Sequence, residues 1–463
     1  MVKGSSMPDL SIATLGPARI DSPLAGMLDA SRTTEHYVNE DDRVLLDDTL
    51  ALASARGVAV DELPSLEPCG PRRRIFFDPS KTRVGIVTCG GLCPGMNDVV
   101  RGLVRNLTYQ YGVRRVTGFR NGYQGFIASY AHDIVELTPD TVAEITVEGG
   151  TVLGTSRGHQ DPQEIVDCLE RLNINMLFVV GGDGSMRGAM RIAEVAAERE
   201  LKISVVGIPK TIDNDIPYID QSFGFQTAFS RAAESIRAVN TEAKSTPNGV
   251  GIVKLMGRHS GFIAAYAALA NHDADVVLIP EVPFGLDGPD GLLEYVHRRV
   301  RERGHAVVVI AEGAGQELLT SPTIGSGTDA SGNTKLRDIG THLRDRIGEH
   351  LESAGITPNI RYIDPSYAIR SVPANAYDKA LCLRLAYNAV HAAMAGRTSM
   401  VVGRLRRRFV HIPMSLAVSR RNQIDPHGDL WMSVLEATGQ PATIGGSAIG
   451  QDHRDIGAVK GVA

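Results

Sequence analysis

The chain has 463 residues, of which 43% are hydrophobic and 22% are charged, and its formal net charge is −5 at pH 7. This length allows about three folded domains, and the slightly acidic balance excludes nucleic-acid binding through a general basic surface. The sequence shows no signal-peptide pattern and no apolar run of the ~18 residues that a membrane-spanning helix needs. The five cysteines are scattered and odd in number, which is typical of a reduced protein. We therefore expect a cytoplasmic protein that binds neither nucleic acid nor membrane.

The first 80 residues differ from the rest because prolines interrupt them repeatedly. One stretch, 41–56, places apolar residues at helical spacing and predicts a helix. We expect residues 1–80 to form an N-terminal extension that wraps around a larger body, with a disordered tail as the alternative.

From Arg83 onward, short runs of valine and isoleucine end at glycines and are followed by amphipathic helices. This pattern is typical of buried parallel strands joined by helical crossovers. It predicts an α/β fold with two doubly wound, Rossmann-like domains of three α/β/α layers. We assign the first domain to 81–224, completed by 371–412, and the second to 225–370. Residues 413–463 end this alternation, and we expect a C-terminal tail without periodicity there.

Two segments about thirty positions apart carry the strongest functional signal. The first, VVGGDGSMRGA (179–189), runs from an apolar strand through glycines into a helix. Its bare backbone would let N–H groups at the helix start approach phosphate oxygens. The alternative is a tight strand-to-helix turn with no ligand. The sequence contains no GxxxxGK[ST], so a P-loop fold is not expected.

The second segment, GIPKTIDNDI (207–216), places Asp213 and Asp215 in a polar turn beside Lys210 and Thr211. Phosphoryl transfer needs a base and a cation close to the transferred group, and this turn offers both. Asp213 could instead be a helix cap or a turn residue. Taken together, the two segments predict the active site of a kinase.

Six motifs in chain order resemble the phosphofructokinase family. They are GGLCPGMND (90–98), GGTVLGTSRG (149–158), GGDGS (181–185), PKTIDND (209–215), MGRHSG (256–261) and YIDPSYAIRS (362–371). Each motif alone is moderately specific, whereas six in the family's order over 83–411 are strong.

This resemblance implies transfer of the γ-phosphoryl group of ATP, with Mg²⁺, to the 1-hydroxyl of fructose 6-phosphate, which gives fructose 1,6-bisphosphate in glycolysis. Residues 81–224 would then bind the nucleotide, and 225–370 would bind the sugar phosphate. The family also implies a homodimer or homotetramer whose sites are completed across subunits, with Arg361 reaching the neighbouring site.

The resemblance also assigns roles to individual positions. Asp213 would be the base that takes the proton of the sugar hydroxyl, with Asp215 orienting the metal or its neighbours. The other catalytic residues would be Lys210, Thr211 and Arg258. The nucleotide would be bound by Gly91, Arg157, Gly158, Gly182, Asp183, Gly184, Ser185 and Gly188, with Asp183 also holding Mg²⁺. The sugar phosphate would be bound by Thr211, Ile212, Asp213, Met256, Gly257, Arg258, Glu312, Arg361, Tyr367 and Arg370.

The choice of phosphoryl donor depends on Gly184. Relatives that use pyrophosphate carry an aspartate at this place, which occupies the space near the α-phosphate and repels it. Lys210 is typical of pyrophosphate users, but a plant and protist branch of ATP enzymes resembles this chain in combining GGDG with PKTIDND. We therefore expect ATP. The alternatives are a pyrophosphate-dependent enzyme and a non-catalytic regulatory subunit, which would usually lack the catalytic carboxylate.

Some features depart from the simple bacterial relatives. Those proteins carry an arginine where this chain has Gly249 and a histidine where it has Tyr367, so substrate affinity is expected to be built differently here. The 13 histidines do not cluster along the sequence. Cys89 and Cys93 lack histidine or cysteine partners at the spacing of a zinc site, so we expect them to be packing residues.

Overall fold

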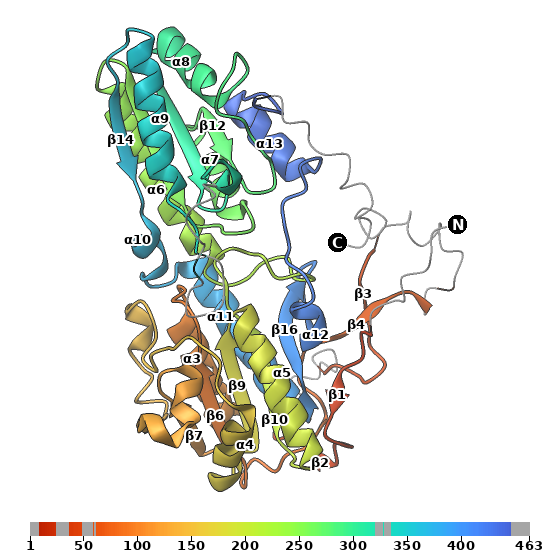
Figure 1. Cartoon of the computed structure of the whole chain (residues 1–463). Helices are drawn as coiled ribbons and strands as arrows, with labels where there is room; N and C mark the ends of the chain where they lie inside the picture. Colours follow the sequence, from red (N-terminus) through yellow and green to blue (C-terminus); the bar gives the residue numbers. More distant parts are fainter. Residues whose placement is uncertain are drawn as a thin grey trace.

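The computed structural model describes residues 9–24, 37–48, 59, 62–319, 327 and 335–445. Figure 1 shows two bodies, each built on a β-sheet with helices packed against it. The prediction of two Rossmann-like α/β domains is confirmed. None of the described helices combines the length and the apolar character needed to cross a bilayer.

The first domain contains a mixed sheet of nine strands in the described part of the chain, in the order β3-β4-β17-β16-β10-β9-β6-β7-β8. The five central strands are parallel, and the flanking pairs are antiparallel. In chain order, the strands are β3 (Val44–Leu45), β4 (Ser65–Pro68), β6 (Arg83–Thr88), β7 (Arg115–Phe119), β8 (Ile134–Glu136), β9 (Met176–Gly181), β10 (Ser204–Pro209), β16 (Met400–Leu405) and β17 (Arg408–Pro413).

Helices bury both faces of this sheet. Along β9, Phe178 belongs to one hydrophobic cluster and its neighbour Leu177 to another, because successive side chains point to opposite faces. The first cluster contains residues of α3 (Met96–Arg105) and α11 (Ala376–Met394), and the second contains residues of α4 (Pro162–Arg171), α5 (Asp183–Glu198) and α12 (Met414–Ala417). A strand covered on both faces needs apolar residues throughout, which explains the unbroken valine and isoleucine runs.

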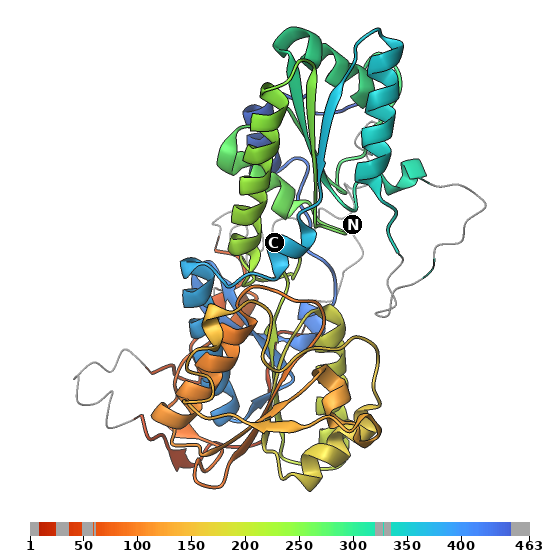
Figure 2. The same ribbon diagram turned by 90° about the vertical axis from the view of Figure 1, so that its left-hand side faces the viewer.

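The second domain is built on a parallel sheet in the order β12-β13-β11-β14. Its strands are β11 (Gly249–Leu255), β12 (Val276–Leu278), β13 (His305–Ala311) and β14 (Asn359–Ile363). Its helices are α6 (Phe225–Lys244), α7 (Phe262–Asn271), α8 (Leu292–Arg303) and α9 (Ile339–Ser353), and α10 (Ser366–Arg370) follows β14. Figure 2 shows α6 and α9 on opposite sides of this sheet.

A single hydrophobic cluster joins the two domains. It includes Phe178 of β9 and Leu103 of α3 from the first domain, and Ile236 of α6 and Val307 of β13 from the second. Burial of apolar surface is the main favourable term in domain association. The shared cluster therefore sets how the two sheets face each other.

The described parts of the N-terminal extension lie along the first domain. Strand β1 (Ala13–Thr14) pairs with β15 (Arg397–Thr398), and β2 (Ile20–Asp21) pairs with β5 (Arg74–Ile75). The helix predicted over 41–56 is wrong where the structure describes it, because β3 forms an edge strand that pairs with β4. Residues 49–58 lie outside the described part. Pairing along the sheet edge overrides the local helical spacing.

The expectation of an aperiodic C-terminal tail over 413–463 is also wrong in its described part, which ends at residue 445. After α12 the chain crosses to the second domain, where α13 (Asp429–Thr438) packs against α7. Trp431 anchors this helix and is only 1% exposed. A ten-residue helix held by one aromatic side chain leaves little periodicity to detect in a sequence.

We expect Trp431→Ala to destabilise the second domain by about 3–5 kcal/mol, because it removes a large buried side chain and leaves a cavity. The neighbouring Met432, 54% exposed on the same helix, provides the matched control in Met432→Ala. Urea-induced unfolding followed by circular dichroism measures both effects. Equal losses in the two variants would show that α13 is not anchored through Trp431.

Candidate active site

A cavity of about 870 Å³ lies between the two domains. Much of its lining comes from loops that directly follow parallel strands, namely β6, β9 and β10 of the first sheet and β11 and β13 of the second. The carboxyl ends of parallel strands are the usual ligand-binding edge of such sheets. The shared core brings two of these edges together around one space.

Most of the residues expected at the site line this cavity. They are Gly91, Arg157, Gly158, Gly182, Asp183, Gly184, Ser185, Gly188, Lys210, Thr211, Ile212, Asp213, Met256, Arg258, Glu312 and Arg370. The two segments identified by the sequence therefore lie at the same cavity.

Three expected residues do not line it. Arg361 lies on β14 and its guanidinium is 3.7 Å from the carboxylate of Glu242. Tyr367 is 75% exposed, and its ring lies 4.9 Å from the guanidinium carbon of Arg370. Gly257 occupies a left-handed turn with φ of 129°, where a Cβ would lie 2.5 Å from the carbonyl oxygen of Ser260. Gly257 thus shapes the turn that carries Met256 and Arg258.

The glycine loop after β9 opens directly into α5. The helix starts at Asp183, and no side chain caps its first turn. The first N–H groups of a helix have no partner within the helix, so they can bind an anion in the cavity. A Cβ added at Gly184 would meet no atom within 4 Å. Any side chain at that position would therefore extend into open space beside the helix start.

Two cations border the glycine loop after β6. A Cβ at Gly90 would lie 3.4 Å from the ammonium of Lys210, and one at Gly91 would lie 3.5 Å from the guanidinium of Arg157. Lys210 is only 7% exposed. Burial lowers the pKa of this lysine, and the positive charge of Arg157 lowers it further, whereas Asp213 opposes both. Lys210 is therefore a buried cation, whereas Arg157 is an exposed one at the edge of the same loop.

The carboxyl group of Asp213 also lines the cavity, and few groups compensate its charge. Its Oδ1 atom is buried and has no hydrogen-bond partner among the described residues. Burial raises the pKa of Asp213 to about 8, Asp215 and Glu312 act in the same direction, and Arg421 and Lys210 oppose the rise. Burial also raises the pKa of Glu312. A carboxylate with a free oxygen and a pKa near neutrality is suited to accept a proton.

Asp215 is compensated much better than Asp213. The hydroxyl of Thr211 donates to its Oδ1 at 3.0 Å, and Arg421 donates to its Oδ2 at 2.9 Å. Thr211 also accepts the backbone N–H of Asp213 at 3.1 Å. Asp215 and Thr211 therefore hold the turn that presents Asp213 to the cavity.

Sequence reasoning missed the arginines that reach the cavity from the segment between α12 and α13. Arg420 and Arg421 both line it, and Arg421 lies 3.7 Å from Asp183 in addition to its contact with Asp215. The backbone N–H of Asn422 donates to the carbonyl of Asp215 at 2.7 Å and fixes this segment. The pair of arginines is visible in the sequence, but it falls in a region that had been expected to be a tail.

The structure explains the glycine that replaces the arginine of simple bacterial relatives. A Cβ at Gly249 would lie 2.0 Å from the carbonyl oxygen of Ala243, which is far inside contact distance. No side chain fits at this position unless α6 moves away from β11. In this chain, another residue must therefore supply the positive charge that the arginine provides in those relatives.

Comparisons with known proteins show the family to which the chain belongs. A family model described as Phosphofructokinase matches residues 83–393. The chain is 59% identical over 446 residues to an ATP-dependent 6-phosphofructokinase of Amycolatopsis methanolica, covering 96% of this chain and 97% of the relative. It is 43% identical to ATP-dependent 6-phosphofructokinase 7 of Arabidopsis thaliana, covering 91% and 85%. A solved pyrophosphate-dependent phosphofructokinase from Marinobacter aquaeolei shares the fold, with a TM-score of 0.63 at 23% identity, covering 81% of this chain and 90% of that one.

The raised pKa of Asp213 predicts a pH-dependent cost to stability. Because this pKa, about 8, lies above the value of 3.8 for an unperturbed aspartate, the folded state binds the proton more tightly than the unfolded state. Below pH 3.8, where the side chain of Asp213 is protonated in both states, it costs no stability. The free energy of unfolding falls as the pH rises from 3.8 toward 8.

We expect Asp213→Asn to be more stable than the original chain by at least about 1 kcal/mol at about pH 8, with a smaller difference at about pH 5. Chemical denaturation without ligands measures the free energy of unfolding at both values. Asp140→Asn, at an exposed position, is the control and should show no such trend. A stability difference that is the same at both pH values would contradict the raised pKa.

Proposed function

The chain belongs to the phosphofructokinase family, and we propose that it is an ATP-dependent 6-phosphofructokinase. It would transfer the γ-phosphoryl group of ATP to the 1-hydroxyl of fructose 6-phosphate. The observation that carries this proposal is one cavity that combines an uncapped helix start, two cations in Lys210 and Arg157, and a carboxylate, Asp213, with a buried oxygen that has no hydrogen-bond partner among the described residues. The names of the relatives support the same activity.

The residues that line the cavity would have different roles in the reaction. The N–H groups at the start of α5 and the guanidinium of Arg157 would hold the phosphates of the donor. Asp213 would accept the proton of the sugar hydroxyl as it attacks, and Lys210 would neutralise charge on the transferred group. Arg258 and Arg370 would face the sugar and its phosphate. Catalysis would then consist mainly of positioning and electrostatic stabilisation.

Mg²⁺ would be held by Asp183, with the metal neutralising charge between the phosphates of the donor. This residue fits the role because its carboxylate lies at the first position of α5 and lines the cavity. Mg²⁺ sites with nucleotides commonly use one or two carboxylates together with phosphates and water. Arg187, at 3.2 Å, and Arg421, at 3.7 Å, balance the carboxylate in the free protein.

Two observations bear on the donor in opposite directions. The open space beside Gly184 leaves room for the α-phosphate of a nucleotide, which favours ATP. Lys210 beside the glycine loop is compatible with pyrophosphate as well as ATP. We give more weight to Gly184, because space that a side chain would occupy is a steric requirement, whereas a cation assists either donor.

We also propose a cytoplasmic homo-oligomer, either a dimer or a tetramer. Arg361 and Tyr367 lie outside the cavity of their own chain, which is what completion of a neighbouring site would require. The five cysteines are all free and four of them are buried, which suits a reducing compartment. The free oxygen of Asp213 argues against the alternative of a regulatory subunit without activity.

Initial rates with fructose 6-phosphate and Mg²⁺, measured in parallel with ATP and with pyrophosphate, test the proposed function. We expect turnover with ATP and a rate with pyrophosphate at least about 100-fold lower, since steric and charge discrimination at a built site commonly reaches this size. Turnover with pyrophosphate alone would replace the proposal with the pyrophosphate-dependent activity. No turnover with either donor would favour the regulatory subunit.

Gly184→Asp should lower kcat/KM for ATP by about 100-fold or more, because the carboxylate would enter the open space and repel the α-phosphate. The low rate with pyrophosphate should fall much less, since pyrophosphate has no α-phosphate, and circular dichroism of the variant is the control for folding. An ATP rate close to that of the original chain would show that Gly184 does not decide the donor.

A further inference from the structure

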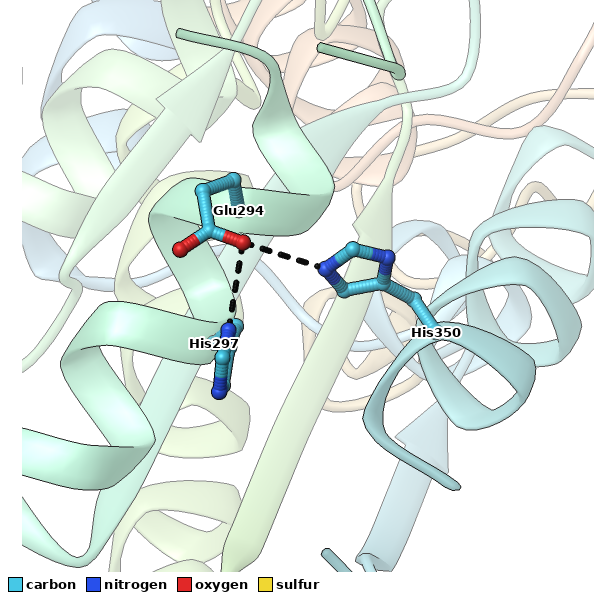
Figure 3. A group of neighbouring side chains, drawn as sticks. All are labelled: Glu294, His297 and His350. Atoms are coloured by element: carbon cyan, nitrogen blue, oxygen red, sulfur yellow. Dashed lines mark hydrogen bonds and ion pairs between the residues drawn. The ribbon is translucent and has the colours of Figure 1, made fainter. Parts of the chain in front are cut away.

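A second group of chemically suitable side chains lies away from the cavity, between two helices that pack on the same face of the second sheet. Glu294 and His297 come from α8, and His350 comes from α9 (Figure 3). Their side chains point toward one another, with each imidazole directed at the same carboxylate. The expectation from the sequence that histidines do not cluster is therefore wrong at this place.

The distances in this cluster resemble those of a metal site. Nδ1 of His297 lies 3.1 Å from Oε2 of Glu294, and Nε2 of His350 lies 3.4 Å from the same oxygen. The ligand atoms of the three residues all lie within 4.8 Å of one another. Zinc bonds nitrogen and oxygen at about 2.0–2.1 Å in tetrahedral sites, so two ligand atoms of such a site lie about 3.3 Å apart. The distances of 3.1 Å and 3.4 Å from Oε2 of Glu294 to the two ring nitrogens are close to this separation.

The charge balance of the cluster also leaves room for a cation. No lysine or arginine in the described part of the chain makes an ion pair with Glu294, whose only such partners are the two imidazoles. Nε2 of His350 is buried and makes no hydrogen bond. A ring nitrogen without a hydrogen bond and a carboxylate oxygen thus face each other, with no lysine or arginine of the described residues paired to that carboxylate.

We propose that Glu294, His297 and His350 bind a divalent transition metal of the zinc class. Two imidazole nitrogens and one carboxylate oxygen supply three ligands, and water would complete the tetrahedron. Mg²⁺ is a poor occupant, because it prefers near-ideal octahedral sites made of oxygen. The site differs from the one at Asp183 in both its position and its ligand chemistry.

Such a metal would cross-link α8 and α9. The N-cap of α9 is Asp338, whose carboxylate lies 3.0 Å from the ammonium of Lys254 on β11. Lys254 also pairs with Asp364, after β14, at 2.9 Å. One end of α9 is thus tied to the sheet by these ion pairs, and the metal would tie its last turns to α8. The expected role is to stabilise the second domain rather than to take part in catalysis.

Metal titration of the full-length, tag-free chain after dialysis against EDTA tests the proposal. With excess Mg²⁺ present to fill oxygen sites, we expect Co²⁺ to bind with the intense visible absorption of a tetrahedral centre, and Zn²⁺ to displace it. Loss of a supporting residue around a metal commonly costs 10–100-fold in affinity, so His297→Gln, His350→Gln and Glu294→Gln should each lower affinity by more than about 100-fold. His427→Gln, at an exposed position away from the cluster, is the matched control.

Thermal unfolding supplies a readout that does not depend on activity. Zn²⁺ should raise the unfolding temperature of the original chain and of His427→Gln, increasingly with metal concentration, and should leave His297→Gln unchanged. Circular dichroism at low temperature checks that each variant is folded, and Glu294→Gln keeps both imidazoles and nearly the same shape. Absence of Co²⁺ binding, an octahedral spectrum, or binding that survives both histidine substitutions would overturn the proposal.

Discussion

The way in which the two sheets face each other is the constraint on which the rest of this structure depends. One hydrophobic cluster contains strand residues of both sheets together with α6, and it holds the carboxyl ends of their parallel strands around a common space. Backbone groups just beyond a strand end are no longer used by the sheet, so loops there can serve a ligand. The glycine loops and the carboxylates meet for this reason, although they belong to strands far apart in the sequence.

The cavity concentrates charges that would be costly to bury singly. Asp213 keeps a free oxygen near Asp215 and Glu312, and Lys210 and Arg421 offset part of the cost. Unpaired buried charge is unfavourable, so the fold must supply the compensating stability elsewhere. It does so in the two sheets, whose central strands are buried on both faces. A ligand whose phosphates contact Lys210 and Arg157 would neutralise the positive charges of these two side chains.

The segment between α12 and α13 links this electrostatic design to the packing of the second domain. Trp431 anchors α13 against α7, and the chain that leads to it crosses the cavity and places Arg421 beside Asp215. The cluster on α8 and α9 illustrates the same principle on the outer face of that domain. There too, side chains that are unremarkable in sequence become a site because two helices pack side by side.

Between β6 and β17, local patterns in the sequence determined the alternation of strands and helices, the two-domain α/β class and the residues next to strand ends, because buried parallel strands and phosphate-binding turns have compositions of their own. Gly184, Lys210 and Asp213 could be found in this way. Only the tertiary structure decided that Arg421 reaches Asp215, that Gly249 has no room for a side chain and that His297 meets His350. These facts depend on distances between segments that are remote along the chain, which the packing of whole helices and sheets sets and no local pattern encodes.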